Sequence, residues 1–175
     1  MRTDTGQVFR LEDYRPSDYL IPQTGLVFSL SPHETMVRAE LLIERRAGAA
    51  VDAPLVLDGE RRAVDRVDIA LAPGERLAIT RLPRSDRFRL TIETAVSPAG
   101  NQALMGLYLS NGVYCTQCEA EGFRRITYFL DRPDILSVYT VRIEAPRALP
   151  CLLSNGNPGE HGLLGVRERA QALRG

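Results

Sequence analysis

The chain has 175 residues, and its 22 acidic side chains balance its 22 basic ones, so the net charge at pH 7 is zero. A neutral chain has no general attraction for nucleic acid or for an anionic membrane, and neither is expected as a partner. Apolar residues form 44% of the chain and charged residues 25%, which is typical of one globular domain with a core of its own.

Signals for membrane insertion or secretion are not found in the sequence. No run of about 18 apolar residues occurs, so no transmembrane helix is expected. The opening MRTDTGQVFRLEDYRP lacks the apolar region of a secretory signal. The three cysteines cannot all pair with one another, which favours reduced thiols and a cytoplasmic location.

The first third of the chain is dominated by period-two alternation. Residues 1–13 show no clear period and are expected to form an extended arm, pinned by Tyr14 and Tyr19. From Gly25 every second residue is a larger apolar one, and the alternation resumes at Val37 after the turn signal SPHE. Two alternating runs around a short polar turn predict a β-hairpin.

Further short strands are expected along the rest of the chain. They fall at residues 54–60, 67–71, 76–82, 87–93 and 139–144, and residues 150–160 are a last short strand with a Gly/Pro-rich exit. Turn signals recur roughly every 8–12 residues, a spacing typical of an all-β sandwich or a related sheet architecture. The final GLLGVRERAQALRG differs, because its apolar residues lie at helical spacing, and it is either a short helix or a frayed tail.

The stretch YCTQCEAEGFRRITYFLDRPD, residues 114–134, has the highest density of reactive side chains. Cys115 and Cys118 form a CxxC pair, a spacing found in zinc ribbons and in redox sites. A structural zinc needs four ligands, yet the remaining Cys151, His33 and His161 form no second paired motif. A redox pair would open a helix in a βαβ unit, which the pattern lacks. The alternative is that both thiols are small packing residues.

Two carboxylates in the same stretch, Glu119 and Glu121, are separated by one residue. On a strand they would face the same side, where they could bind a cation together or raise each other's pKa. In the simpler interpretation one is solvated and the other pairs with Arg124 or Arg125. Because HExxH, GxSxG, P-loop and GxGxxG motifs are all missing, a complete active site is not expected and no catalytic residue is assigned.

Several blocks of the chain resemble one known family, in the order in which that family has them. They are EDYRPSDYLIPQTGLVFSLSPHETMVRAELLI, APLVLDGE, TAVSPAGNQALMGLYLSNG, VYCTQCEAEGFRRITYFLDRPDILSVYTVRIEA and LLSNGN. On these residues the chain resembles the N-terminal domain of bacterial aminopeptidase N enzymes, which are M1 (gluzincin) zinc metallopeptidases. The resemblance covers residues 14–157 and leaves 158–175 as an unassigned tail.

The resemblance implies a saddle-like β-sandwich that packs on a thermolysin-like catalytic domain. In that family the zinc, its HExxH helix and the GAMEN motif belong to the catalytic domain, so no cofactor is expected in this chain. The glutamine and glutamate of the QCE triplet, here Gln117 and Glu119, would line the first substrate subsite. Glu119 would bind the free α-amino group of a peptide. Expected partners are therefore a peptide N-terminus and the catalytic domain of the same enzyme, and the chain alone would be inactive.

Two alternatives from other functional classes remain open on the sequence. One is a stand-alone β-sandwich that binds a partner protein or a peptide N-terminus, since the chain has a tail of its own after residue 157. The other is a zinc or redox module built on Cys115 and Cys118.

Overall fold

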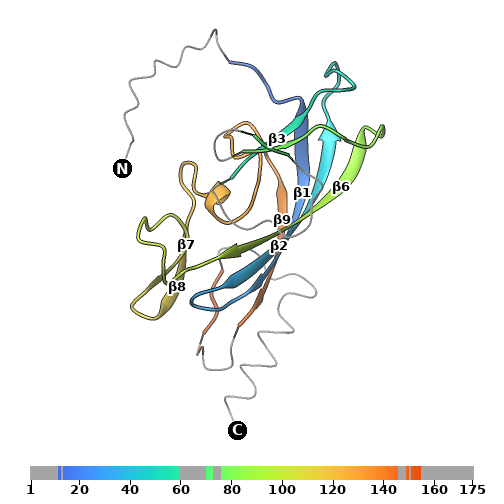
Figure 1. The fold of residues 1–175 in the computed structure, drawn as a ribbon. Helices are drawn as coiled ribbons and strands as arrows, with labels where there is room; N and C mark the ends of the chain where they lie inside the picture. The colour runs from blue at the N-terminus through green and yellow to red at the C-terminus, as the bar shows by residue number, and fades with distance from the viewer. Residues whose placement is uncertain are drawn as a thin grey trace.

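The computed structural model describes residues 12, 14–59, 70–72, 76–145, 149 and 151–154. Figure 1 shows that the regular secondary structure of this part is almost entirely β-strand, so the all-β prediction is confirmed. The elements are β1 Tyr19–Ser29, β2 Thr35–Arg45, β3 Leu55–Asp58, β4 Ala70–Ala72, β5 Arg76–Ile79, β6 Arg87–Val96, β7 Gly106–Ser110, β8 Val113–Gln117, the 3₁₀ turn η2 Phe123–Arg125 and β9 Val138–Glu144. No helix in these residues is long and apolar enough to cross a bilayer.

Some sequence expectations fall outside the described residues. The extended arm over residues 1–13, apart from residue 12, and the tail over 158–175 are among them. The strand expected at 67–71 is described only from residue 70 onward, as β4. Residues 151–154, the described part of the last expected strand, have no regular structure, so the prediction of a strand is wrong there.

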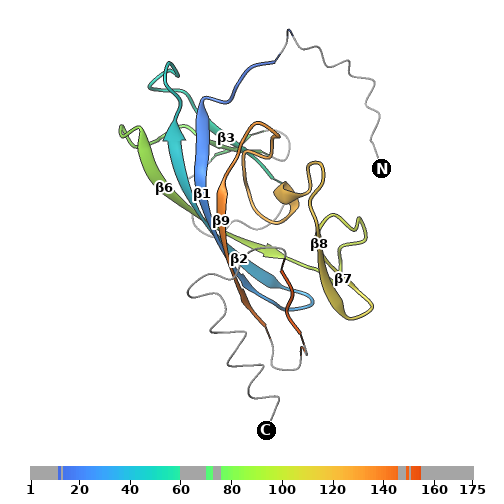
Figure 2. The same ribbon diagram turned by 180° about the vertical axis from the view of Figure 1, so that it is seen from behind.

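The largest sheet has the strand order β6-β2-β1-β9. The predicted hairpin is confirmed, because β1 and β2 pair antiparallel, and β6 adds to β2 in the same way. β9 instead runs parallel to β1 at the sheet edge, which Figure 2 shows from behind. Sequence alternation predicted β9 as a strand but not its partner or its direction.

The first strand begins at Tyr19, six residues before the alternation is visible in the sequence. The register with β2 shifts between Leu20 and Gln23, so the inward-facing positions change from odd to even numbers across this step. Pro22 lies in the step, where neither it nor Ile21 has a partner residue in β2, and a proline is tolerated at such an irregularity. Because of this irregularity, the first residues of the strand do not continue the period-two pattern that begins at Gly25.

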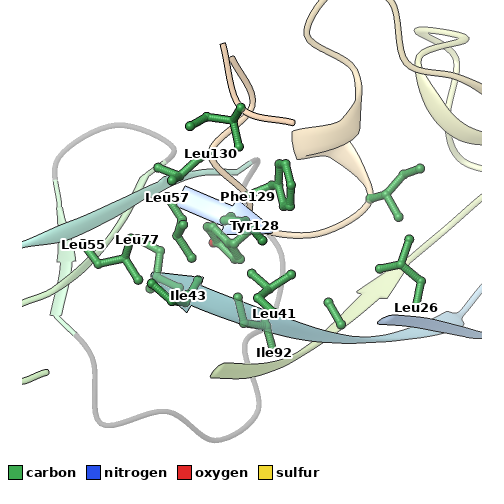
Figure 3. Packing of buried hydrophobic residues seen from close by; sticks show 14 of the residues in the cluster. Leu26, Leu41, Ile43, Leu55, Leu57, Leu77, Ile92, Tyr128, Phe129 and Leu130 are labelled. Carbon is green, nitrogen blue, oxygen red and sulfur yellow. The ribbon is translucent and has the colours of Figure 1, made fainter. Parts of the chain in front are cut away.

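A second layer covers the inner face of the large sheet. It consists of the small sheet β3-β5-β4 and the segment after η2, and the two are joined where Asp58 and Phe129 exchange backbone hydrogen bonds of 2.8 and 3.0 Å. Figure 3 shows Leu57 and Tyr128 lying over Leu41 and Ile43 of β2. All four side chains are buried, and this apolar contact is the main source of the stability of the domain.

The strands β7 and β8 form a separate hairpin beside this core. Its tip is Asn111-Gly112, and both residues have positive φ, 48° and 80°. That combination is typical of a two-residue type I′ turn. The sequence analysis did not identify this hairpin, although an Asn-Gly pair between short apolar runs is a hairpin signal. The hairpin matters here because β8 ends at Gln117, the first predicted site residue.

Candidate functional site

A tight turn over residues 118–122 joins β8 to η2 and carries the predicted site. The turn is closed by the N–H of Gly122, which donates to the carbonyl of Cys118 over 2.8 Å. The peptide bond between Glu119 and Ala120 is cis. Gln117 at the end of β8 and Glu119 in the turn are both exposed, so the structure places the two predicted residues at one exposed corner of the domain. Figure 2 shows η2 between β9 and the β7–β8 hairpin.

The two carboxylates of this turn have different surroundings. Neither Glu119 nor Glu121 belongs to a strand, so the condition under which they would share one face is not met, and the simpler interpretation of one solvated and one paired carboxylate is confirmed. Strand β8 ends at Gln117, so both carboxylates lie after it. Glu121 forms an ion pair with Arg124, with 3.6 Å between Oε2 and Nη1. Within the described residues the Glu119 carboxylate has neither a hydrogen bond nor an ion pair.

Two glycines allow the backbone around the turn to pack closely. A Cβ on Gly122 would lie 2.7 Å from the carbonyl oxygen of Gln117, closer than side-chain atoms come in proteins. Gly106, opposite Gln117 in the hairpin, has φ +74°, and a Cβ there would lie 2.7 Å from the Cβ of Arg125. Larger residues at either position would push the turn away from the hairpin or from η2.

Three aromatic rings pack against one another next to the turn, where η2 begins. Phe123 of η2 meets Phe129 edge-on at 4.9 Å and Tyr139 of β9 at 5.7 Å between ring centroids. Burial of its phenol raises the pKa of Tyr139 to about 12, with smaller contributions from the charges of Asp131 and Cys118. The rings therefore contribute to packing, and they join β9 to the segment that carries the site.

The two cysteines of the CxxC pair are free thiols in the structure. Cys118 packs against the core, and burial followed by the charge of Asp131 raises the pKa of its thiol. Redox cysteines have lowered pKa values, so this environment argues against a redox site. Among the described residues, no group of three or more His, Cys, Asp or Glu is arranged to hold a metal ion. Cys151 and His33 are exposed, and His161 lies outside the described residues.

A partly buried charge network behind the turn was not expected from the sequence. Arg124 donates from Nε to Asp131 over 2.9 Å, and its Nη2 lies 3.9 Å from Asp58 at the end of β3. Asp58 is also paired with Arg76 of β5 at 3.2 Å. The sequence offered Arg124 only as a partner of a nearby glutamate, because nothing local indicates that Asp58 comes close to it.

Comparison with known proteins links this geometry to one family. The family model of the peptidase M1 N-terminal domain matches residues 60–168. Aminopeptidase N of Caulobacter vibrioides is 53% identical over 173 residues, which cover 94% of this chain but only 20% of that protein. The chain thus spans about a fifth of the length of this curated relative.

Two solved structures share the fold. In the crystal structure of Legionella pneumophila aminopeptidase A in complex with aspartic acid, the matching region has a TM-score of 0.68 and 28% identity, covering 77% of this chain and 17% of that one. The M1 zinc metallopeptidase of Deinococcus radiodurans matches with a TM-score of 0.60 and 20% identity, over 75% of this chain and 33% of that one. At that identity the second match shows the fold alone.

Proposed function

Since this chain belongs to the M1 peptidase family as an N-terminal domain, we propose that it is the substrate-anchoring domain of a zinc-dependent aminopeptidase, which removes N-terminal amino acids from peptides. Glu119 binds the α-amino group of the peptide, and Gln117 lines the same subsite. The observation that carries this proposal is the state of Glu119, an exposed carboxylate without a protein partner in the described residues, on a turn held by close backbone packing.

The chemistry of an exopeptidase requires such a group. The enzyme must distinguish a terminal ammonium from an internal amide, and an ammonium that leaves water needs a carboxylate partner. A hydrogen bond to a charged group contributes roughly 1.5–3 kcal/mol, and the group left unpaired costs more. Gln117 can both donate and accept a hydrogen bond, which suits the polar end of the same peptide. A carboxylate at a fixed distance from the reacting centre thus selects the first residue of the substrate.

Zinc and the reacting groups belong to another part of the enzyme in this proposal. The chain contains no HExxH motif, and it spans only 20% of the length of its Caulobacter relative. Exposed apolar side chains on β9 support contact with a further domain, since Val138 is 72% and Val141 40% exposed. The proposal includes the domain limits 14–157 and a cytoplasmic location, which the free thiols favour.

The proposal is tested by a substitution of Glu119 in the full-length enzyme to which this domain would belong. Glu119→Ala is expected to lower kcat/KM for an aminoacyl anilide by roughly 2–4 kcal/mol of transition-state stabilisation, or about 30- to 1,000-fold. Glu121→Ala is the matched control, because this carboxylate lies on the same turn but is exposed and already paired with Arg124. If kcat/KM of Glu119→Ala stays within about twofold of the wild type, Glu119 does not bind the substrate.

A further inference from the structure

We propose that Arg124 is a positioning residue of this site, which fixes the end of the 118–122 turn to the core so that Glu119 keeps one place relative to the substrate. The inference rests on the proposed function of Glu119 and adds a residue that does not itself touch the peptide. It begins from an asymmetry: Glu119 has no partner in the described part of the chain, whereas Arg124, five positions on, has several.

Arg124 and Asp131 are joined by three hydrogen bonds. The backbone N–H of Arg124 donates to Oδ2 of Asp131 over 3.1 Å, and Nε donates to the same oxygen over 2.9 Å. Nη2 donates to the backbone carbonyl of Asp131 over 2.8 Å. Because main chain and side chain of one residue bind main chain and side chain of the other, η2 has no freedom to rotate relative to the segment at 131. This arrangement needs the planar guanidinium, since a lysine ammonium presents no such pair of parallel donors.

The network is largely removed from solvent. The side chains of Arg124, Asp131 and Asp58 are 24%, 12% and 15% exposed. Burial alone lowers the pKa of Arg124, but the hydrogen bond to Asp131 and the charges of Asp58 and Glu121 outweigh it and raise the pKa. The guanidinium is therefore charged at every working pH. Its loss would leave the largely shielded carboxylate of Asp131 without its cation, while Asp58 would keep only its pair with Arg76.

The other side of the network leads into the core. Asp58 ends β3, and its backbone exchanges two hydrogen bonds with Phe129, a residue that is 3% exposed. Arg124 thus joins the end of the turn to the second layer of the sandwich. The start of the turn is held independently, since Gln117 is paired with Gly106 in the β7–β8 hairpin. With both ends of a five-residue turn fixed, the backbone at Glu119 has little room to move.

Loss of Arg124 should act on substrate binding more than on the chemical step. Glu119 would bind the ammonium both before and during the reaction, so its displacement removes binding that the two states share and raises KM. Displacement of a binding group by about 1 Å can cost up to 100-fold in rate. For Arg124→Gln we expect kcat/KM to fall by roughly tenfold, chiefly through KM, with unchanged zinc content.

The experiment compares five single variants, Glu119→Ala among them, and one double variant of the full-length enzyme. Arg124→Lys keeps the charge but not the paired bonds, so it should stay impaired. Asp131→Asn removes the charge of the partner with little change in shape, and provides a second route to the same defect if Arg124→Gln folds poorly. Arg76→Gln is the matched control, because Arg76 also pairs with Asp58 but is 63% exposed and belongs to β5. Its KM should equal that of the wild type.

Two readouts separate positioning from a general loss of structure. In a double-mutant cycle, Arg124→Gln should change kcat/KM little once Glu119 is replaced by alanine, since both substitutions remove the same interaction with the substrate. Hydrogen-exchange mass spectrometry of the intact enzyme should show faster exchange at residues 118–122 in Arg124→Gln but not in Arg76→Gln.

Each outcome supports or overturns the inference. A normal KM in Arg124→Gln and Asp131→Asn, while Glu119→Ala is impaired, overturns the role of Arg124 and leaves the proposed function intact. The inference is also overturned if Arg124→Gln lowers kcat/KM by the same factor in the wild type and in Glu119→Ala. Full activity of Arg124→Lys overturns it too. If Glu119→Ala is itself fully active, the proposed function fails and this inference fails with it.

Discussion

Gly122 lies directly against the backbone of Gln117, the residue five positions before it. A Cβ added to Gly122 would stand 2.7 Å from the carbonyl oxygen of Gln117 and 2.8 Å from the Cα of Cys118. Both neighbours are main-chain atoms, which cannot move aside as a side chain can. The tightness of the turn that carries Glu119 therefore depends on the missing side chain at position 122.

Gly122→Ala is expected to destabilise the domain by about 1–3 kcal/mol, the usual cost of forcing an extra methyl group into a packed site. The same change should lower the activity of the full-length enzyme, because the turn must open to admit the methyl group. Urea denaturation of the chain measures the first effect, and kcat/KM measures the second.

Gly112→Ala provides the control for backbone strain without a clash. Gly112 has φ +80° at the tip of the β7–β8 hairpin, and nothing lies within 4 Å of a Cβ built there. The substitution should cost about 1–2 kcal/mol, because an L-residue is strained in the left-handed region. It should leave KM unchanged. An equal loss of activity in Gly112→Ala and Gly122→Ala would show that general destabilisation, and not the position of the turn, is responsible.

Replacement of Leu57 tests the contact between the two layers. Leu57 is fully buried over the large sheet, so Leu57→Ala should lower the free energy of unfolding by about 2–5 kcal/mol. Val56, its neighbour on β3, faces outward and is 37% exposed. Val56→Ala should therefore change the free energy of unfolding by no more than about 0.5 kcal/mol. Similar values for the two variants in urea denaturation would contradict this packing.

The segment before β1 is held by a pH-sensitive contact. Tyr14 donates to Asp134 over 2.8 Å, and Arg132 donates to the same carboxylate over 2.8 and 2.9 Å. The bonds from Arg132 and then Tyr14 lower the pKa of Asp134 despite partial burial, while the bond to Asp134 raises the pKa of Tyr14.

The sign of each shift fixes the pH range of this contact. The contribution of Asp134 is present above its unfolded pKa of about 4 and is lost as pH falls through the lower folded value. The contribution of Tyr14 is present below its unfolded pKa of about 10, and it is lost as pH rises through the higher pKa of the folded state. Tyr14→Phe should thus lower Tm slightly at neutral pH, and the difference should shrink toward both extremes. A difference that does not vary with pH would mean that only the packing of the ring matters.

Cys118 should be the slower of two thiols to react. Burial and the charge of Asp131 raise its pKa, and the thiolate is the reactive form. At pH 8 iodoacetamide should therefore modify Cys118 more slowly than the exposed Cys151, as followed by peptide mass spectrometry. Faster modification of Cys118 would restore the redox interpretation of the CxxC pair.

Much of the sheet could be predicted because alternation is a local property. In β2 the side chains at every second position are buried from Thr35 to Arg45, and between Val37 and Leu41 the sequence shows this as alternating apolar and charged residues. The family assignment also came from contiguous residues, above all the QCEAEG block. The roles of Gln117 and Glu119 stay predictions until substrate binding is measured.

The sequence by itself determined most of the strands, though not the β7–β8 hairpin, since burial of alternate side chains needs only the order of neighbouring residues. Only the tertiary structure decided which strands pair when they are distant in the sequence, because β9 lies parallel to β1 although more than a hundred residues separate them. It also decided the different surroundings of Glu119 and Glu121. Arg124 pairs with Glu121, which is three residues before it, and with Asp58, which lies in the second layer. The second contact joins residues far apart in the sequence, so it depends on how the whole chain packs.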